Sequence, residues 1–395
     1  MQRDELAAWL RLSLTPGVGN GAARRLLAAF GLPQQVFAQS ETALQACVGA
    51  AQARALCADP PDFAAQLERA WRWLQDGAAP AHGAPAHAIV PLGDAAYPPQ
   101  LLATEDPPLL LYALGAPHLV RARPIAPEQC LAVVGSRNPT AQGQDNARQF
   151  ARSLRGAGWC IVSGLALGVD AAAHEGALQC PPDAGASASA LPATIAVVGT
   201  GLDRVYPKAN ADLARRIAQA GLLLSEYPLG TPPLAGNFPK RNRIIAGLAR
   251  GTLVVEAALA SGSLITARLA SEQGREVFAI PGSIHAPQSR GCHALLRQGA
   301  KLVETAQDVL EELRWPAAAQ RALDMAPAPV AAPPADAAPG DALLQALGFD
   351  PLGLDALMAR TGLDAATLQV RLLELELAGQ VARLPGGIFQ RAGSA

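Results

Sequence analysis

Residues 131–164 read LAVVGSRNPTAQGQDNARQFARSLRGAGWCIVSG, and this stretch indicates the fold class most directly. It begins with the apolar run LAVVG and ends with the apolar run CIVSG, and NARQFARSLRGAG between them has helical periodicity. Two short apolar strands joined by a helix are typical of a parallel βαβ unit. Because both strands are apolar almost throughout, the predicted sheet is covered by helices on both faces.

The same alternation continues on both sides of this unit and predicts an α/β domain over residues 93–313. Stretches with helical periodicity lie between most of the apolar runs. The predicted strands are residues 109–115, 131–135, 160–164, 194–200, 222–226, 252–257 and 276–282.

Composition and length predict more than one domain in this chain of 395 residues. Half of the residues are apolar and 16% are charged, which excludes a mostly disordered protein. The predicted divisions are a helical domain at 1–75, a Pro/Gly/Ala connector at 76–92, the α/β domain at 93–313, a Pro/Ala linker at 314–340 and a small domain at 341–395.

The six cysteines include no C-x-x-C pair, so neither a disulfide framework nor a zinc site is expected. The amino-terminal segment MQRDELAAWLRLSL has acidic residues where a signal peptide is basic, and no apolar run reaches membrane-spanning length. We therefore expect a cytoplasmic protein with no membrane partner.

Net charge is −1, but the charge is distributed unevenly. Residues 131–313 contain 17 basic and 14 acidic side chains, whereas residues 1–130 contain 9 and 11. Overall charge gives no sign of nucleic-acid binding, yet the central segment can still hold a local basic site.

The ends of the predicted strands are where a parallel sheet binds ligands. Small and polar residues follow several strands there, and backbone amides at such turns attract anions, above all phosphate. A glycine after one strand is usually only part of a tight turn, but five such exits on one edge favour a ligand site. The residues concerned include Gly135, Ser136, Arg137, Ser163, Gly164, Lys208, Ser261, Gly262 and Ser263.

The sharpest feature is the run Lys240-Arg241-Asn242-Arg243, which opens the predicted helix IIAGLA. No acidic residue occurs from Tyr227 to Val255, and cations at a helix amino terminus oppose the helix dipole. One interpretation is a phosphate clamp in which arginines make bidentate contacts. The other is a solvated basic turn that pairs with acids elsewhere in the fold.

The sequence gives little support for nucleotide binding or for catalysis. There is no P-loop, and Gly199-x-Gly201 lacks the third glycine and the acidic residue of a dinucleotide fingerprint. Asp170 and His174 are four residues apart on one predicted helix, but such a pair is more often structural than catalytic. We expect no catalytic residues, no metal site and no cofactor.

Several motifs together closely resemble the bacterial DNA-processing protein A family, called DprA or Smf. They are GSRNPT, SGLALGVDAAAH, TIAVVGTGLDRVYP, SEYPLG, FPKRNRIIAGLARGTLVVEAALASGSLITA, EQGREVFAIPG and GCHALLRQGAKLV. The resemblance is strong over residues 93–313 and looser in both flanks. It implies an extended Rossmann-like domain that binds single-stranded DNA, forms a homodimer and loads the RecA recombinase during natural transformation, without enzymatic turnover.

Carried over by motif, the resemblance implies a DNA site at the nine residues above together with Lys240, Arg241, Asn242 and Arg243. Only Tyr206, Tyr227 and Phe238 offer aromatic rings near the strand ends, so we expect phosphate contacts to dominate and binding to be salt-sensitive. Residues 179–193 are longer than the family pattern and are predicted to be a surface insertion.

Two rival functions stay open. One is a nucleotide-cleaving enzyme of the phosphoribohydrolase kind, although this chain has EAALASGS at 256–263 where those enzymes have P-G-G-x-G-T-x-x-E. The other is a structural adaptor that binds no DNA.

The flanks predict two accessory modules. Residues 12–30 resemble a helix–hairpin–helix with its turn at Pro16-Gly17-Val18-Gly19, for which DNA contact and protein packing are equally compatible. Residues 341–395 predict a winged helix with Asp364 capping its third helix. That helix offers only Arg371 against Glu374 and Glu376, so we favour a protein-binding role over DNA binding.

Overall fold

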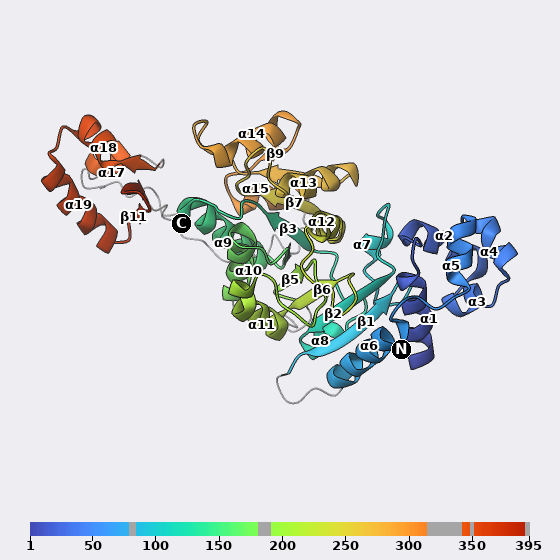
Figure 1. The fold of residues 1–395 in the computed structure, drawn as a ribbon. Helices are drawn as coiled ribbons and strands as arrows, with labels where there is room; N and C mark the ends of the chain where they lie inside the picture. The colour runs from blue at the N-terminus through green and yellow to red at the C-terminus, as the bar shows by residue number, and fades with distance from the viewer. Residues whose placement is uncertain (79–83, 181–190, 314–341, 348–350, 392–395) are drawn as a thin grey trace.

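The computed structural model describes residues 1–78, 84–180, 191–313, 342–347 and 351–391. Its largest element is a sheet of nine strands in the order β1-β2-β6-β5-β4-β3-β7-β8-β9 (Figure 1). The predicted α/β class is confirmed. The strands are β1 (Ala86–Pro91), β2 (Leu110–Gly115), β3 (Cys130–Val134), β4 (Cys160–Ser163), β5 (Thr194–Val197), β6 (Leu222–Ser225), β7 (Gly251–Val254), β8 (Glu276–Ala279) and β9 (Lys301–Leu302).

Strand direction divides the sheet into two parts. From β6 to β9 all neighbouring strands are parallel, whereas β2 is antiparallel to both β1 and β6. The chain places β3 to β6 one after another and then returns to add β7 on the other side of β3. The carboxyl ends of β3 and β7 therefore flank the topological switch point, where open α/β sheets bind ligands.

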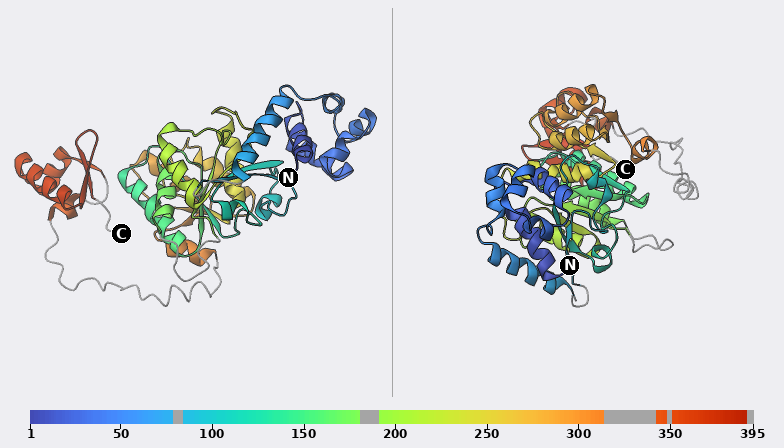
Figure 2. Two further views of the ribbon diagram at one scale, coloured as in Figure 1. Left: turned by 90° about the horizontal axis from the view of Figure 1, so that it is seen from below. Right: turned by 90° about the vertical axis from the view of Figure 1, so that its right-hand side faces the viewer.

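Helices cover both faces of the sheet (Figures 1 and 2). One layer contains α9 (Ala141–Gly156), α10 (Val169–Gln179) and α11 (Ala211–Ala220), which pack on strands β2 to β6. The other contains α12 (Asn237–Leu248), α13 (Ser263–Glu272) and α14 (Arg290–Arg297), which pack on strands β3, β4, β5, β7 and β8. Shorter helices complete the domain: α7 (Pro99–Leu102), α8 (Pro117–Val120) and α15 (Ala306–Glu312).

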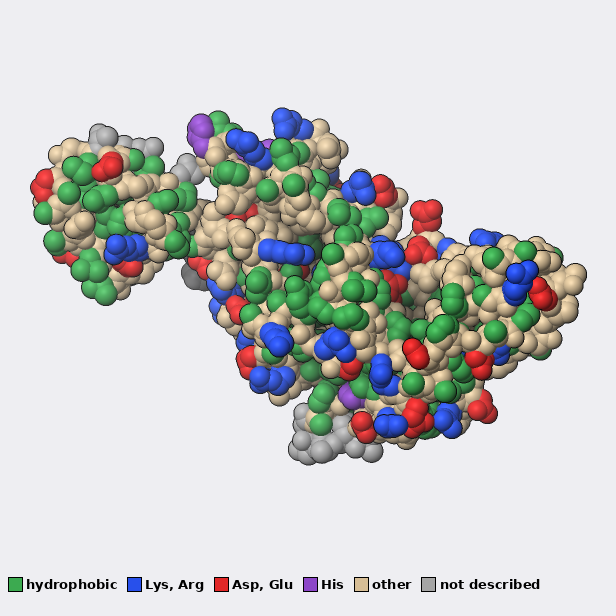
Figure 3. Space-filling model, viewed as in Figure 1, with side chains coloured by type: hydrophobic (Ala, Val, Ile, Leu, Met, Phe, Trp, Pro, Cys, Tyr) green, Lys and Arg blue, Asp and Glu red, His purple; other side chains and the backbone are tan. Residues whose placement is uncertain are grey.

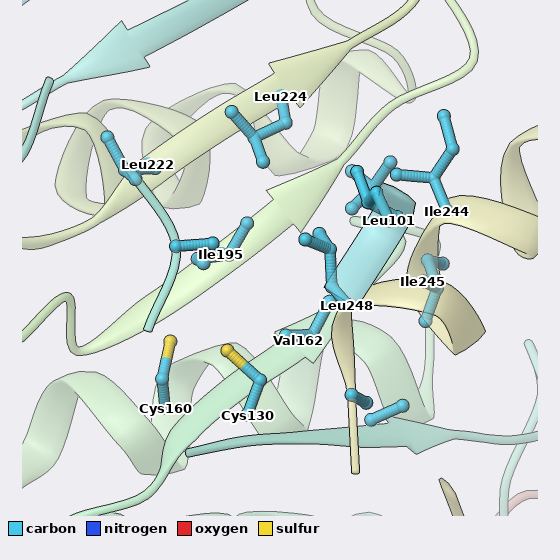
Figure 4. Close-up of a cluster of buried hydrophobic side chains, with 14 of the residues drawn as sticks. Leu101, Cys130, Cys160, Val162, Ile195, Leu222, Leu224, Ile244, Ile245 and Leu248 are labelled. Carbon is cyan, nitrogen blue, oxygen red and sulfur yellow. The ribbon is translucent and has the colours of Figure 1, made fainter. Parts of the chain in front are cut away.

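Alternation of side chains along the strands supplies the core beneath α12 (Figure 4). Cys160 and Val162 on β4 point to the same face of the sheet as Ile195 on β5, because every second residue of a strand shares a face. These side chains meet the apolar side of α12, which consists of Ile244, Ile245 and Leu248.

The predicted connector at 76–92 was wrong over much of its length. Helix α6 (Phe63–Ala78) extends into its beginning, and β1 occupies residues 86–91. The run AHAIVP is apolar enough to pair with β2, and Ala86, Ile89 and Val90 are buried by that pairing. The Pro/Gly/Ala composition on its amino-terminal side concealed this short strand.

Six helices precede the sheet: α1 (Arg3–Leu14), α2 (Asn20–Phe30), α3 (Pro33–Phe37), α4 (Glu41–Cys47), α5 (Ala50–Leu56) and α6. Leu12, Ala23, Leu26 and Leu44 form the centre of their own apolar core. The predicted hairpin turn lies between α1 and α2, and Gly17 adopts a positive φ of 79° there, a conformation that favours glycine.

The carboxyl-terminal region has the predicted winged-helix elements. They are α17 (Ala342–Leu347), β10 (Leu352–Gly353), α18 (Leu354–Thr361), α19 (Ala365–Leu377), β11 (Val381–Leu384) and β12 (Ile388–Arg391), with sheet order β10-β12-β11. The Asp364 carboxylate caps α19 by accepting from the amides of Ala366 and Thr367 at 3.0 Å. The predicted linker at 314–340 lies outside the described residues, as do positions 181–190 of the predicted insertion.

Among the described residues, no helix combines the length and the hydropathy needed to cross a bilayer.

Candidate functional site

Strands β3 to β7 end at one edge of the sheet, and the predicted site residues lie in the segments that follow them. We call these segments the strand-end edge: residues 135–140, 163–170, 198–210, 226–243 and 255–263. The structure separates the predicted residues into exposed side chains, buried side chains and side chains that are already paired.

Three of the predicted site residues in the strand-end edge are exposed cations: Arg137, Lys208 and Lys240. A fourth exposed cation, Arg204, pairs with Asp203 at 3.4 Å. Arg137 follows β3, Lys208 follows β5, and Lys240 lies in the first turn of α12. Within the described part of the chain, none of the three forms an ion pair. Their charges are therefore available to an anionic ligand.

Two aromatic rings lie near Arg137. The ring centroids of Tyr206 and Phe238 are 5.5 Å apart, and the Arg137 guanidinium carbon is 5.9 Å from the Phe238 centroid. Tyr206 is 46% exposed and Phe238 is half-buried. Gly199 makes room for the Phe238 ring, because a Cβ at that position would lie 3.1 Å from Phe238 Cδ1.

The sequence placed these two rings near the strand ends but did not predict them as site residues. Tyr206 lies in the connection after β5 and Phe238 in the connection after β6, and each precedes a proline, Pro207 or Pro239. That pattern shows neither their mutual contact nor the contact with Arg137, because the three residues come from three different connections.

Arg241 is predicted to contact DNA, but the structure buries its side chain. Its side chain is 4% exposed, and Nη1 donates to the Val197 carbonyl at 2.7 Å. A Cβ at Gly164 would collide with this guanidinium, so the glycine after β4 makes room for it. Burial lowers the pKa of Arg241, an effect that the nearby Asp170 carboxylate opposes. A guanidinium enclosed in this way cannot reach a phosphate, and it braces the ends of β4 and β5 instead.

Asp170 holds the turn after β4. Its carboxylate accepts from the amides of Gly164 at 3.1 Å and Ala166 at 3.3 Å. Burial raises the pKa of Asp170, whereas Arg241 and these amides act in the opposite direction.

His174 stands apart from Asp170 and makes a different contact. Its Nδ1 lies 2.7 Å from the Thr194 hydroxyl, which itself donates to the Ile161 carbonyl at 2.6 Å. Nδ1 is therefore the protonated nitrogen and donates to Thr194 Oγ1. Burial lowers the pKa of His174 to about 3, and the positive charge of Arg241 adds to that effect. The ring is neutral and structural.

Arg243 is paired, as the alternative interpretation of the basic run expected. Its guanidinium donates to both carboxylate oxygens of Glu226, at 3.1 and 2.5 Å, and to Asp106 at 2.9 Å. The side chains of Arg243 and Glu226 are only 16% and 14% exposed. The prediction of Arg243 as a phosphate-binding side chain conflicts with this arrangement, because its charge is already neutralised.

Several smaller predicted residues shape the strand-end edge from within. Ser163 is fully buried and donates to the Val133 carbonyl at 2.6 Å. Ser261 and Ser263 bond to each other through their hydroxyls at 2.7 Å. Asn242 Nδ2 donates to the Gly262 carbonyl at 3.2 Å, which ties α12 to the turn before α13.

The turn after β3 is fixed by its own backbone. The Ser136 amide donates to the Glu256 carbonyl at 2.7 Å, and the Ser136 carbonyl accepts from the Val169 amide at 3.1 Å. A Cβ at Gly135 would lie 2.8 Å from the Glu256 carbonyl oxygen. These contacts hold the backbone from which the exposed Arg137 side chain projects.

A carboxylate of the chain occupies the switch point between β3 and β7. Glu256 accepts from the Thr140 amide at 2.9 Å and from the Thr140 hydroxyl at 2.6 Å, at the start of α9. A Cβ at Gly143 would lie 2.3 Å from the Glu256 carboxyl carbon. This helix amino terminus, where dinucleotide-binding sheets place a phosphate, is filled by Glu256.

Figure 3 shows one face of the molecule with its side chains coloured by type. In the view of Figure 3, hydrophobic side chains gather over the middle of the nine-stranded domain, with Lys and Arg side chains around them. Among the described residues, no group of three or more His, Cys, Asp or Glu side chains is arranged to hold a metal ion.

Fold and site together define a class of protein: a Rossmann-like α/β domain between a helical and a winged-helix region, with an exposed basic and aromatic strand-end edge. Residues 88–314 match the family described as DNA recombination-mediator protein A, and residues 326–387 match the DprA winged helix domain. The chain belongs to the DNA recombination-mediator protein A family, also called DprA or Smf.

The chain is similar to several individual proteins. Protein Smf of Escherichia coli is 42% identical over 325 residues, which are 81% of this chain and 80% of the relative. The crystal structure of DNA processing protein A from Streptococcus pneumoniae is 37% identical, with a TM-score of 0.61 over 79% of this chain and 98% of that one. A Helicobacter pylori DNA processing protein A, described as having a unique single-stranded DNA binding mode, is 31% identical with a TM-score of 0.49, over 58% of this chain and 95% of that one.

Proposed function

We propose that this chain binds single-stranded DNA along the strand-end edge and delivers it to a RecA-type recombinase, acting as a homodimer and without catalysis. The observation that supports DNA binding is that the strand-end edge combines three exposed cations, unpaired among the described residues, with an aromatic pair, Tyr206 and Phe238, one ring of which lies beside Arg137. The RecA and homodimer parts of the proposal rest on family membership.

Each component of the cluster fits one part of a single strand. Arg137, Lys208 and Lys240 provide the charges that attract phosphates. Tyr206 and Phe238 provide ring faces on which a base can stack. Because the bases of a duplex are already stacked on one another, a stacking contact of this kind favours an unpaired strand.

The other predicted residues act by holding this surface in place. Gly164 and Arg241 brace the ends of β4 and β5, and Asn242 ties α12 to Gly262. Arg243 anchors α12 through Glu226 and Asp106. We therefore assign the direct phosphate contacts to the three exposed cations.

The nucleotide-cleaving alternative fits the geometry less well. The Glu256 carboxylate fills the helix amino terminus at the switch point, where it repels a nucleotide phosphate. Incubation with nucleoside monophosphates is expected to release no free base. Release of base at a rate that increases with protein concentration would favour this alternative.

Fluorescence anisotropy with labelled oligo-dT and with the matched duplex tests the main proposal. We expect tighter binding of the single strand and weakening as salt increases. Equal affinity for both forms would contradict a site that uses base stacking. No binding of either form would favour the adaptor alternative.

Recombinase delivery needs a separate assay. RecA filament assembly on single-stranded DNA, followed by light scattering, is expected to start sooner when the chain is present. If the lag of RecA filament assembly is unchanged while DNA binding is normal, the proposed delivery to RecA is contradicted. The proposed DNA site is not affected by that result.

A further inference from the structure

Helix α19 of the winged-helix region is apolar on two opposite faces. Its inner face, Leu368, Leu372 and Leu375, is buried in the core of that region. On the outer face Val370, Leu373 and Leu377 are 59%, 56% and 82% exposed. Contiguous apolar side chains exposed on a surface often mark an interaction site.

The exposed side chains form one continuous row, which we call the α19 apolar row. Val370, Leu373 and Leu377 are three and four positions apart, the spacing that aligns side chains along one side of a helix. Ala366, one turn earlier, is also exposed and extends the row towards the start of α19.

The composition of this face is unsuited to DNA. In a winged helix that binds DNA, the third helix enters the major groove with basic and amide side chains. Within α19 the only basic residue is Arg371, and it pairs with Glu374 at 2.9 Å. The carboxylates beside the row repel phosphates, and the apolar side chains of the row offer phosphates no hydrogen-bond donor.

Charges on both sides of the row identify the chemistry of its partner. Helical periodicity places Glu374 along one side of the row and Glu376 along the other, and neither side chain is buried. We propose that the α19 apolar row binds an amphipathic helix of a partner protein, with apolar side chains against the row and basic side chains beside Glu374 and Glu376.

A second copy of this chain is a poorer occupant. Two α19 helices packed through their apolar rows would bring Glu374 and Glu376 of one copy close to the same carboxylates of the other. Like charges at such a contact disfavour association.

The probe for the test is a designed helical peptide with leucines at three- and four-residue spacing and lysines on its other positions. A second peptide keeps the leucines and replaces every lysine by glutamate. Binding of both labelled peptides to the full chain is measured by fluorescence anisotropy. We expect binding of the Leu/Lys peptide and at least tenfold weaker binding of the Leu/Glu peptide.

Surface variants locate the contact. Leu373→Ser combined with Leu377→Ser is expected to weaken binding of the Leu/Lys peptide at least tenfold. Ile284→Ser is the matched control, because Ile284 is 74% exposed on the α/β domain and its loss is expected to change nothing. Equal binding by the Leu373/Leu377 variant and the unaltered chain would overturn the proposal.

Charge reversal provides an independent readout if the serine variant fails to fold. Glu374→Lys with Glu376→Lys is expected to shift the preference from the Leu/Lys to the Leu/Glu peptide. An unchanged preference would overturn the proposed charge recognition. Sedimentation of the unaltered chain against Leu373→Ser tests the second-copy alternative, and a loss of self-association in the variant would overturn the assignment to a partner protein.

Discussion

Three basic side chains within four positions of α12 have different environments. Lys240 is exposed, Arg241 is buried against β4 and β5, and Arg243 is paired with Glu226 and Asp106. Helical rotation separates neighbours by about 100° and so directs each one to a different environment. Only Lys240 keeps a charge that a ligand can reach, so substitutions along this run have distinct consequences.

Arg137→Ala is expected to weaken binding of single-stranded DNA about tenfold while leaving the melting temperature unchanged. The side chain is exposed and contributes both a charge and a contact with Phe238, and such contributions are worth roughly 1–2 kcal/mol together. Arg250→Ala is the matched control, because Arg250 is an exposed arginine immediately before β7, at the opposite edge of the sheet. Equal losses in both variants would indicate that binding depends on overall charge only.

Lys240→Ala and Arg241→Ala are expected to separate binding from stability. Removing Lys240 reduces DNA affinity and leaves stability unchanged or slightly higher, because a cation in the first turn opposes the helix dipole. Removing Arg241 leaves Asp170 without its nearby positive charge in the interior and is expected to cost about 3 kcal/mol of unfolding free energy. Chemical denaturation and anisotropy of both variants provide the check. A stable Arg241→Ala protein with lost DNA binding would reverse our assignment.

His174 predicts a pH dependence of stability. Its pKa is about 3 in the folded chain against 6.5 in the reference state, so the unfolded chain takes up the proton first. The His174 contribution therefore falls as pH decreases from about 6.5 towards 3, with a limiting slope of about 1.4 kcal/mol per pH unit. His174→Asn keeps a donor for Thr194 but cannot titrate. The difference in unfolding free energy between the unaltered chain and His174→Asn should shrink on acidification. A constant difference would contradict a buried neutral imidazole.

At the scale of elements, connections from three strands together build the part of the strand-end edge that holds Arg137 and the aromatic pair. The segments after β3, β5 and β6 supply Arg137, Tyr206 and Phe238, and their rings and guanidinium meet although the sequence separates them widely. Tight backbone turns at Gly135 and Gly199 allow this approach, since a Cβ at either position would crowd Glu256 or Phe238. The two rings therefore meet because the parallel sheet brings the connections after β5 and β6 to the same edge.

Phe238→Ala is expected to lower the affinity for oligo-dT by roughly 1–3 kcal/mol, the usual effect of removing one stacking ring. An oligonucleotide of the same length with abasic sugars is the control ligand. Because it offers phosphates without bases, its weaker binding should be insensitive to the substitution. An equal loss for both ligands would assign Phe238 to a purely structural role.

Seven of the nine strands could be predicted from sequence, because each is an apolar run long enough to stand out. The other two could not: β1 follows a Pro/Gly/Ala-rich stretch, and β9 has two residues whose pairing depends on β8. The antiparallel direction of β2 also required the tertiary structure.

The candidate site was predictable as a set of segments, but the role of each side chain was not. Sequence identified Lys240, Arg241 and Arg243 as one basic run, whereas their partners are remote: Asp106 lies 137 residues from Arg243, and Val197 lies 44 residues from Arg241. Nothing in local sequence distinguishes the buried arginine from the exposed lysine before the helix is placed on the sheet.

At the scale of the whole molecule, the account assigns different ligands to two surfaces. The strand-end edge offers exposed cations and aromatic rings, which suit a nucleic acid strand. The α19 apolar row offers leucines between carboxylates, which suit a protein helix. Because the charges at the two surfaces are opposite, we expect each surface to attract a different ligand.

The most direct test of the central claim is the salt dependence of oligo-dT binding by the unaltered chain and by Arg137→Ala/Lys208→Ala/Lys240→Ala. Three phosphate contacts to a single strand predict a slope of about −2 for the logarithm of the binding constant against the logarithm of salt concentration. In the folded triple variant the account predicts a slope near zero and a large loss of affinity. An unchanged slope and affinity in that variant would show that the DNA binds elsewhere.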